Sequence, residues 1–333
     1  MKAAVYRGFG PPEVVGVVEI RKPAPARNEV LVRVHASTVS VADHRARTRE
    51  VPKGLWPLAM LGIGAVRPRH RVLGTDVAGV VEAVGADVTT FKPGDEVIGM
   101  LGGKFGGHAE YACLPADGAI AAKPRGMSFE DAVTLVFGGI TARGFLNRAE
   151  LKPGDTVLVN GASGAVGTAA VQIAKHLGAH VTGVCSGANT ELVTSLGADR
   201  VIDYTTDDFT TEGKTYDAIV DCVGNAPFER VEGCINPGGA LLLVITDLNG
   251  ILWASRRSRT SGKLVTWNGG KPNAADLRFL VNLAESGQYR PVVDRTYELS
   301  DIVEAHRYVD TGHKKGNVIL RVAPSTLDRP SAS

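Results

Sequence analysis

The stretch VLVNGASGAVG, residues 157–167, joins an apolar run to three glycines spaced three residues apart. The apolar run predicts a buried strand, and the glycines follow where a helix begins. The free N–H groups and the dipole of such a helix start can hold a pyrophosphate. Gly161 permits the turn, Gly164 lets backbone approach a phosphate, and Gly167 allows close packing of helix on strand. The stretch predicts a dinucleotide site, and a turn that serves packing alone is the alternative.

The residues around this junction alternate between strands and helices from about residue 128 onward. Ser128 precedes a predicted helix and has Asp131 three positions later, which is typical of a helix N-cap. A helix is predicted for residues 164–177, with an apolar face of helical period. Strands are predicted at residues 155–160 and 180–184 and in the runs RVIDY, YDAIVDCV and ALLLVI. This alternation indicates an α/β fold with a doubly wound parallel sheet.

Residues 1–120 have a different pattern, made of short β-rich runs broken by Gly, Pro and Asp. The runs lie at residues 29–35, 75–85, 95–99 and 110–114. Such spacing predicts an antiparallel, barrel-like domain. Residues 290–322 are predicted to form a strand, a helix and a strand that return to this first domain.

The chain has 333 residues, a length that suggests about two domains. Hydrophobic residues make up 44%, enough to bury a large core. The 37 basic and 35 acidic residues give a net charge of +2, too balanced to predict nucleic acid or a membrane as the main partner. The four cysteines form no CxxC pair, so we expect a cytoplasmic location. No apolar run resembles a secretory leader or approaches the roughly 20 residues of a membrane span.

Two short stretches are nonetheless basic. Residues 44–71 hold seven Lys and Arg residues against one Glu, and residues 255–263 read SRRSRTSGK. A loop that faces water explains each of them. The first stretch also holds Leu and Trp side chains without clear periodicity, so a mobile lid over a substrate cleft stays open as an alternative.

Seven motifs, the glycine-rich stretch included, run in order along the chain. They are MKAAVYRGFGPPEVV at the start, GTDVAGVVEAVG at 74–85, FKPGDEVIG at 91–99, LKPGDTVLVNGASGAVG at 151–167, LGADRVIDY at 196–204, YDAIVDCVG at 216–224 and NPGG at 236–239. Together they resemble the medium-chain dehydrogenase/reductase superfamily, in its zinc-independent quinone oxidoreductase branch. The resemblance implies a GroES-like β-barrel domain in residues 1–125 and 290–333 and a Rossmann domain in residues 126–289. NADPH and substrate would meet in the cleft between them.

The residues after the second predicted strand bear on the choice of dinucleotide. An acidic residue there would bind the ribose 2′-hydroxyl of NAD and repel the 2′-phosphate of NADP. Residues 185–190 read CSGANT and contain no acid, which favours NADP. The resemblance places Ser186 and Tyr204 at positions that face the 2′-phosphate. Ala188 stands where relatives often have Lys or Arg, so one charge-assisted contact is missing and NAD stays open.

The resemblance assigns further residues to the cofactor NADP(H). Those of the pyrophosphate loop are Gly161, Ser163, Gly164, Ala165, Val166 and Gly167. Those along the nicotinamide half are Thr141, Val223, Ile245, Lys315 and Asn317.

Alcohol-oxidising relatives hold a catalytic zinc, and this sequence lacks the matching ligands. The early Cys of those enzymes would fall near Ser40, and Thr75 and Asp76 stand in the run that holds their His and Glu. We therefore expect no zinc and no other metal. Ser40 stands where many relatives have Asn and is a candidate catalytic residue that donates to a substrate oxygen. Asp43 follows as in those relatives, either in a catalytic role or as a turn or helix cap.

Without a metal to polarise it, the acceptor must already be electrophilic, as quinones and α,β-unsaturated carbonyls are. The sequence thus predicts an NADPH-dependent reductase of such compounds, and the resemblance predicts a homodimer. The proton donor and the acceptor are not determined, and His44 and Arg45 either face the cleft or lie in an exposed loop. Two alternatives stay open. One is a zinc-type alcohol dehydrogenase with unusual ligands. The other is a non-catalytic NADPH-binding or regulatory protein, for which RNA binding is one option.

Overall fold

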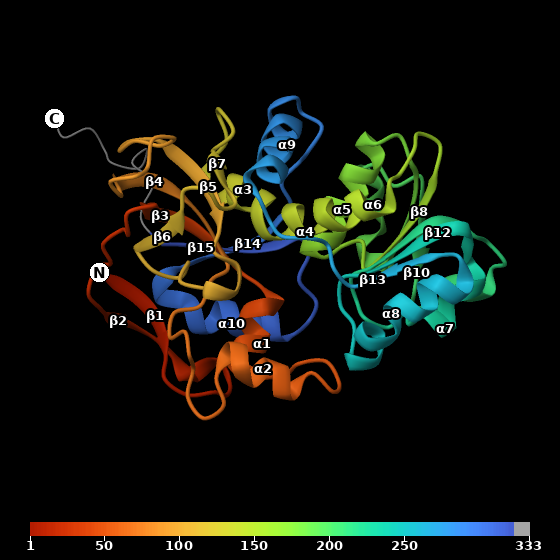
Figure 1. The fold of residues 1–333 in the computed structure, drawn as a ribbon, viewed down its shortest axis with the longest axis horizontal. Coiled ribbons are helices and arrows are strands. Elements are labelled where there is room, and N and C mark those ends of the chain that lie inside the picture. Colours follow the sequence, from red (N-terminus) through yellow and green to blue (C-terminus); the bar gives the residue numbers. More distant parts are fainter. Residues whose placement is uncertain (323–333) are drawn as a thin grey trace.

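The structure of the protein is a computed structural model that describes residues 1–322. Residues 323–333, the end of the range predicted to return to the first domain, lie outside the described residues. Two lobes, each built on its own β-sheet, lie side by side (Figure 1). The first sheet draws its strands from both ends of the chain, and the second draws them from the middle.

The sheet from the middle of the chain is entirely parallel. Its strands are β8 (Thr156–Asn160), β9 (His180–Cys185), β10 (Arg200–Asp203), β11 (Tyr216–Asp221), β12 (Ile235–Leu243) and β13 (Leu264–Thr266). They are ordered β10-β9-β8-β11-β12-β13. The order reverses between β8 and β11, and such a switch point opens a crevice at the carboxyl ends of the strands. The predicted doubly wound sheet is confirmed.

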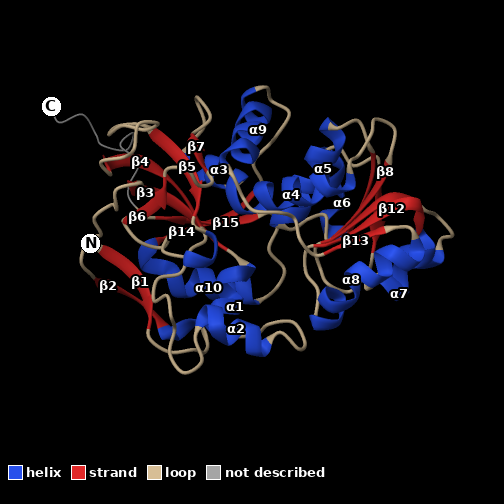
Figure 2. Ribbon diagram, in the orientation of Figure 1, coloured by secondary structure: helices blue, strands red, loops and turns tan. Residues whose placement is uncertain are grey.

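Helices cover both faces of this sheet, with α5 and α6 on one side and α7 and α8 on the other (Figure 2). Gly164 caps α5 and Leu177 ends it, as the predicted helix required. Residues 167–174 of α5 are all buried, because this helix packs against the sheet core. The helices of this lobe are α4 (Ile140–Ala149), α5 (Ala165–His176), α6 (Thr190–Ser195), α7 (Phe228–Val231), α8 (Leu248–Ser261) and α9 (Ala274–Glu285).

The other lobe holds a seven-stranded sheet and a separate hairpin of β1 (Lys2–Tyr6) and β2 (Val15–Glu19). The sheet strands are β3 (Glu29–Val39), β4 (Asp76–Val84), β5 (Glu96–Met100), β6 (Tyr111–Pro115), β7 (Ile120–Ala122), β14 (Val293–Glu298) and β15 (Asn317–Arg321). Its helices are α1 (Val41–Thr48), α2 (Trp56–Ile63), α3 (Phe129–Val133) and α10 (Ile302–Asp310). Ser128 caps α3 by accepting from the Asp131 N–H, as predicted.

The last two strands join the sheet of the first lobe. β15 pairs antiparallel with β3, and β14 lies parallel to β15 because α10 forms the crossover between them. The sheet is therefore antiparallel, as predicted, except for its last pair. Its strand path runs from β14 to β7 without closing among the described residues. GroES-like and Rossmann lobes are both present, and the predicted domain boundaries near residues 125 and 290 stay a prediction.

Candidate nucleotide-binding and active site

The glycine-rich turn forms the junction between β8 and α5. The N–H groups of Gly161 and Ala162 donate to the Val184 carbonyl at 3.0 and 2.9 Å, so the end of β9 holds the turn in place. Gly161 has φ +82°, and a Cβ added to Gly167 would lie 2.1 Å from the Gly161 oxygen. Both positions therefore require glycine for the fold itself.

Gly164 differs from these two glycines, because the protein leaves room for a side chain there. It is the N-cap of α5 with φ −81°, and an added Cβ would come no closer than 3.6 Å to the Gly161 oxygen. Within the described residues no side chain caps this helix. The N–H groups in the first turn of any α-helix have no partner inside the helix, and in α5 these groups begin at Ala165. Open space beside such groups fits the pyrophosphate of a dinucleotide.

A segment from the far end of the chain lies against this turn. The Gly316 N–H donates to the Ser163 carbonyl at 2.8 Å, and Gly316 forms a parallel bridge with Gly164. Lys315, a predicted cofactor residue, is thereby brought next to the turn, and its side chain is exposed. Sequence reasoning missed Lys314, whose Nζ donates to the Gly316 carbonyl at 2.7 Å and whose pKa burial lowers to about 8. Lys314 Nζ is thus held at Gly316, the residue that bridges to Gly164.

The loops after β8, β9 and β10 bring together the residues predicted for the adenosine side. The Asn189 amide donates to Ser163 Oγ at 3.2 Å and to Ser186 Oγ at 3.1 Å. The Tyr204 N–H donates to the Cys185 carbonyl at 3.1 Å, and the Tyr204 side chain is 61% exposed. Hydroxyl and amide groups therefore line the edge of the crevice here, and their contact with a 2′-phosphate stays a prediction.

Asp203, the last residue of β10, lies beside this group and was missed by the sequence analysis. It pairs in register with Cys185, and a Cβ on Gly187 would lie 2.4 Å from Asp203 Oδ2. Hydrogen bonds from the N–H and the hydroxyl of Thr205 hold the pKa of Asp203 below its usual value. An ionised carboxylate therefore faces the turn after β9, although residues 185–190 contain no acid. Only the register of two strands could have revealed it.

A pocket of about 240 Å³ lies at the carboxyl ends of β12 and β13. Its lining includes Thr141 from α4, Val244 after β12, and Trp267 and Asn268 after β13. The Thr141 hydroxyl donates to the Phe137 carbonyl at 2.7 Å, which fixes the rotamer of that side chain. Thr141 was predicted along the nicotinamide half, whereas Trp267 and Asn268 were not singled out, although both follow the last strand of the sheet.

Three other residues predicted along the nicotinamide half have different surroundings. Val223 is 49% exposed and lies against Gly161, where an added Cβ would be 2.8 Å from Val223 Cγ2. Ile245 follows β12 and is partly buried. Asn317 is buried, and its side-chain amide donates to the Val292 carbonyl at 3.2 Å. Asn317 therefore positions the backbone beside the turn, and its contact with a cofactor stays a prediction.

The two predicted catalytic residues form the capping box of α1, which begins directly after β3. Asp43 Oδ2 accepts from the Ser40 hydroxyl at 2.6 Å and from the Ser40 N–H at 2.8 Å. Asp43 Oδ1 accepts from the Gly74 N–H at 2.7 Å, and both side chains are buried. The structure thus shows the helix-cap role of Asp43. A catalytic role of either residue stays a prediction.

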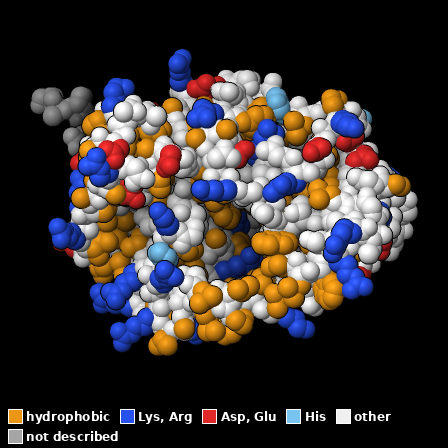
Figure 3. Space-filling model, in the orientation of Figure 1, with side chains coloured by type: hydrophobic (Ala, Val, Ile, Leu, Met, Phe, Trp, Pro, Cys, Tyr) orange, Lys and Arg blue, Asp and Glu red, His pale blue; other side chains and the backbone are white. Residues whose placement is uncertain are grey.

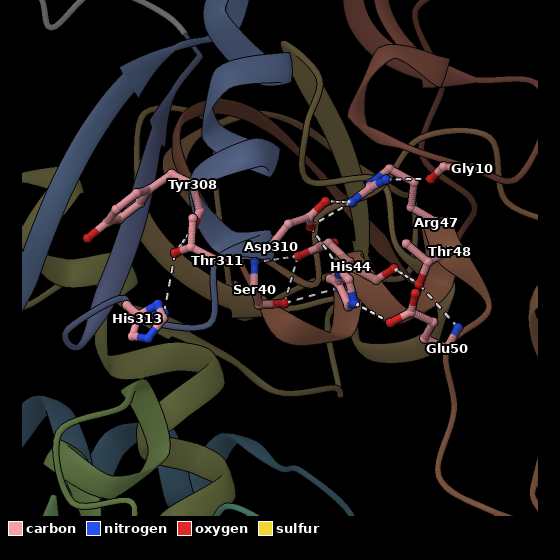
Figure 4. A network of polar contacts seen from close by, with 11 residues as sticks. Gly10, Ser40, His44, Arg47, Thr48, Glu50, Tyr308, Asp310, Thr311 and His313 are labelled. Carbon is pink, nitrogen blue, oxygen red and sulfur yellow. Dashed lines mark hydrogen bonds and ion pairs between the residues drawn. The ribbon is translucent and has the colours of Figure 1, made fainter. Parts of the chain in front are cut away.

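A second polar network joins α1 to α10 (Figure 4). His44 Nδ1 lies 2.7 Å from Asp310 Oδ1, and His44 Nε2 lies 3.2 Å from Glu50 Oε2. The fully buried Arg47 donates to Asp310 Oδ1 at 2.6 Å and to the Gly10 carbonyl. The network holds the helix after β3 against segments from both ends of the chain. His44 is therefore part of a tertiary network rather than of a free loop.

The residues at the zinc positions of alcohol-oxidising relatives do not fit a metal ion. Asp76 is fully buried, and its Oδ1 accepts from the Thr38 N–H at 2.8 Å and from the Thr38 hydroxyl at 3.0 Å. Burial raises the pKa of Asp76 to about 7 and so disfavours its ionised form. A metal ion binds a carboxylate in the ionised form. Among residues 1–322, no three His, Cys, Asp or Glu side chains gather as a metal ion requires.

A parallel sheet with a glycine-rich turn at its switch point, joined to a GroES-like lobe, defines a two-domain dinucleotide-binding fold. Residues 26–124 match the family described as alcohol dehydrogenase GroES-like domain, and residues 196–320 match the family described as zinc-binding dehydrogenase. The chain belongs to the medium-chain dehydrogenase/reductase superfamily, in its quinone oxidoreductase-like branch.

Individual relatives are similar over 80% or more of their own length. The chain is 34% identical over 319 residues to the chloroplast envelope quinone oxidoreductase homolog of Arabidopsis thaliana, covering 91% of this chain and 92% of that relative. It is 30% identical over 336 residues to the 2-methylene-furan-3-one reductase of Solanum lycopersicum, covering 97% of this chain and 80% of that relative. The quinone oxidoreductase structure from Coxiella burnetii has a TM-score of 0.81 at 28% identity, covering 97% and 99%. The protein is an oxidoreductase of a family that uses a nicotinamide cofactor.

Proposed function

We propose that this protein is a zinc-independent, NADPH-dependent reductase that transfers a hydride to a quinone or an α,β-unsaturated carbonyl. Relatives named quinone oxidoreductase and 2-methylene-furan-3-one reductase support the substrate class. One observation carries the proposal: there is open space at Gly164, beside N–H groups of the first turn of α5 that have no partner inside the helix. Gly316, which forms a β-bridge with Gly164, borders the same place.

The residues of the crevice have separate tasks in this proposal. The first-turn N–H groups of α5 bind the pyrophosphate, and Lys315 adds positive charge beside it. The pocket that contains Thr141 and Trp267 receives and orients the nicotinamide end. When bound, the cofactor supplies the hydride. The acceptor must be electrophilic by itself, because the residues at the zinc positions do not fit a metal.

The preference for NADPH is supported by the donors on the adenosine side. Ser186, Asn189 and Tyr204 offer hydroxyl and amide groups to a 2′-phosphate, while Asp203 opposes its charge. The proposal predicts a larger thermal shift with NADPH than with NADH at equal concentration, since a ligand stabilises the native state in proportion to its affinity. A larger shift with NADH would refute this preference.

We also propose a homodimer in a reducing, cytoplasmic compartment. β13 ends the parallel sheet, and an edge strand offers unpaired backbone groups to a second copy. All four cysteines are free, which suits a reducing environment. Light scattering after size exclusion tests the dimer, and a monomer at micromolar concentration would contradict it.

The activity is tested by steady-state oxidation of NADPH with a panel of quinones and enones. We expect turnover with at least one acceptor by protein that elemental analysis shows to be free of zinc. NADPH binding without turnover of any acceptor would favour the non-catalytic alternative. Stoichiometric zinc that activity requires would favour the alcohol dehydrogenase alternative.

A further inference from the structure

Large apolar side chains gather on one exposed surface of the molecule. Twelve are exposed among residues 1–322, and half of these belong to two segments: Trp56, Leu58, Leu61, Val66, Leu252 and Trp253. The first segment contains α2, whose sequence WPLAMLGI has no charged residue and in which no residue is buried. A helix that is apolar on all sides is normally covered by another part of the protein or by a partner.

The two segments form one continuous surface, although they come from different lobes. The Leu248 N–H donates to the Lys53 carbonyl at 3.0 Å, and a Cβ on Gly54 would lie 2.7 Å from Leu248 Cβ. We call residues 51–71 and 248–263 together the α2–α8 surface. Figure 3 shows its apolar side chains along the lower edge of the molecule, with Lys and Arg side chains among them.

The charge of the α2–α8 surface is entirely positive. Neither of its segments contains Asp or Glu. Within the described residues Arg257 pairs with Glu229, and the other basic side chains of the surface form no ion pair. The basic residues are Lys53, Arg67, Arg69, Arg71, Arg256, Arg257, Arg259 and Lys263. The near-neutral net charge of the chain conceals this local excess, so the sequence-based expectation of no membrane partner does not apply to this surface.

Aromatic and basic side chains are arranged together on it. The Arg256 guanidinium lies 5.2 Å from the ring of Trp253. The guanidinium of Arg49, two residues before the surface begins, lies 5.0 Å from the ring of Trp56. Leu252, Arg256 and Arg259 are spaced four and three residues apart, so they share one face of α8. Tryptophan rings with flanking cations and aliphatic side chains are typical of helices that lie in a membrane interface.

We propose that the α2–α8 surface docks the protein on a bilayer that carries anionic lipids. None of the described helices is both long and apolar enough to cross a bilayer, so the contact is peripheral. The apolar side chains enter the interface, and the Lys and Arg side chains lie against anionic headgroups. Nucleic acid would match the cations but would leave Leu58, Leu61 and Leu252 without an apolar environment. A second copy would bring its own cations against these, which disfavours a dimer through this surface.

Sedimentation of the full chain with vesicles tests the proposal and needs neither substrate nor cofactor. Vesicles of phosphatidylcholine alone are compared with vesicles that also contain phosphatidylglycerol. We expect binding to the anionic vesicles that weakens with salt. The L58Q/L61Q and R67E/R259E variants should each lose about tenfold or more in affinity, because apolar burial and headgroup attraction are both removed in part.

Matched controls separate this surface from general stickiness. V17Q changes an exposed apolar side chain elsewhere, and R125E/R148E reverses two exposed charges elsewhere; both should bind like the wild type. Unchanged melting temperatures show that the variants fold. Absence of binding to anionic vesicles, or equal loss in the controls, would overturn the proposal. The proposal would also be overturned if the surface variants still bound vesicles but lost self-association or RNA binding that the wild type shows.

Discussion

The substitution Gly164→Ala separates a glycine required by a ligand from one required by the fold. A methyl group at Gly164 would meet nothing closer than the Gly161 oxygen at 3.6 Å, an ordinary van der Waals distance. We therefore expect the free energy of unfolding to change by less than about 1 kcal/mol. The same methyl group would keep a phosphate from the first-turn N–H groups of α5. Loss of one charge-assisted hydrogen bond, about 1.5–3 kcal/mol, predicts a roughly 10- to 150-fold weaker Kd for NADPH.

The matched control is Gly167→Ala, three residues further along the same turn. Its Cβ would lie 2.1 Å from the Gly161 oxygen and 2.8 Å from the Ala162 Cα, so backbone must move. We expect a loss of stability of about 3 kcal/mol, read from urea unfolding monitored by circular dichroism. Calorimetric titration with NADPH gives the affinities. If Gly164→Ala binds NADPH like the wild type, or loses stability as Gly167→Ala does, the phosphate site has been placed wrongly.

Three further substitutions test other parts of the structure. Asp203→Asn removes the carboxylate beside Gly187, so the Kd for NADPH should fall severalfold while the Kd for NADH does not fall. An unchanged ratio of the two Kd values in calorimetry would refute this electrostatic effect. The folded-state pKa of Asp76 is raised to about 7, so above about pH 4 the folded protein keeps a proton that the unfolded protein releases. The free energy of unfolding therefore falls as the pH rises from about 4 to about 7, by a contribution on the order of 4 kcal/mol. Urea unfolding across this range should show that Asp76→Asn lacks this decrease, whereas an identical pH profile would contradict the assignment. Arg47→Met leaves Asp310 and the Gly10 carbonyl without their buried partner, and should lower the free energy of unfolding in urea by about 3 kcal/mol. A decrease of less than about 1 kcal/mol would show that the network contributes little to stability.

Local patterns were sufficient to predict the parts of the site that lie within one turn of chain. Gly161, Gly164 and Gly167 stand at a strand-to-helix junction as their spacing predicted, and Ser128 caps its helix. In both cases the partners are a few residues apart, so the sequence itself contains the geometry. The capping box of Ser40 and Asp43 is equally local, although the helix cap was only one of the roles left open for Asp43.

Apart from the contact of Lys314 with Gly316, the contacts that sequence reasoning missed join residues that are distant in the sequence. Asp203 reaches the turn after β9 through the register of two strands, and His44 meets Asp310 across 266 positions. Gly316 lies on Ser163 because β15 returns to the first sheet. No periodicity or spacing encodes such pairs, since they depend on how whole elements pack. The α2–α8 surface was likewise seen only as two separate basic stretches.

Hydride transfer is tested most directly with NADPH that carries deuterium at C4 of the nicotinamide. The purified protein, shown by elemental analysis to be free of zinc, is incubated with labelled NADPH and an α,β-unsaturated ketone, and the product is examined by NMR. The proposed function predicts deuterium at the β-carbon of the saturated ketone for one of the two C4 positions. A hydroquinone would lose the label to water, so turnover of quinones is read from NADPH oxidation. Tight NADPH binding with neither labelled ketone nor oxidation of NADPH by any quinone in the panel would contradict the proposed function.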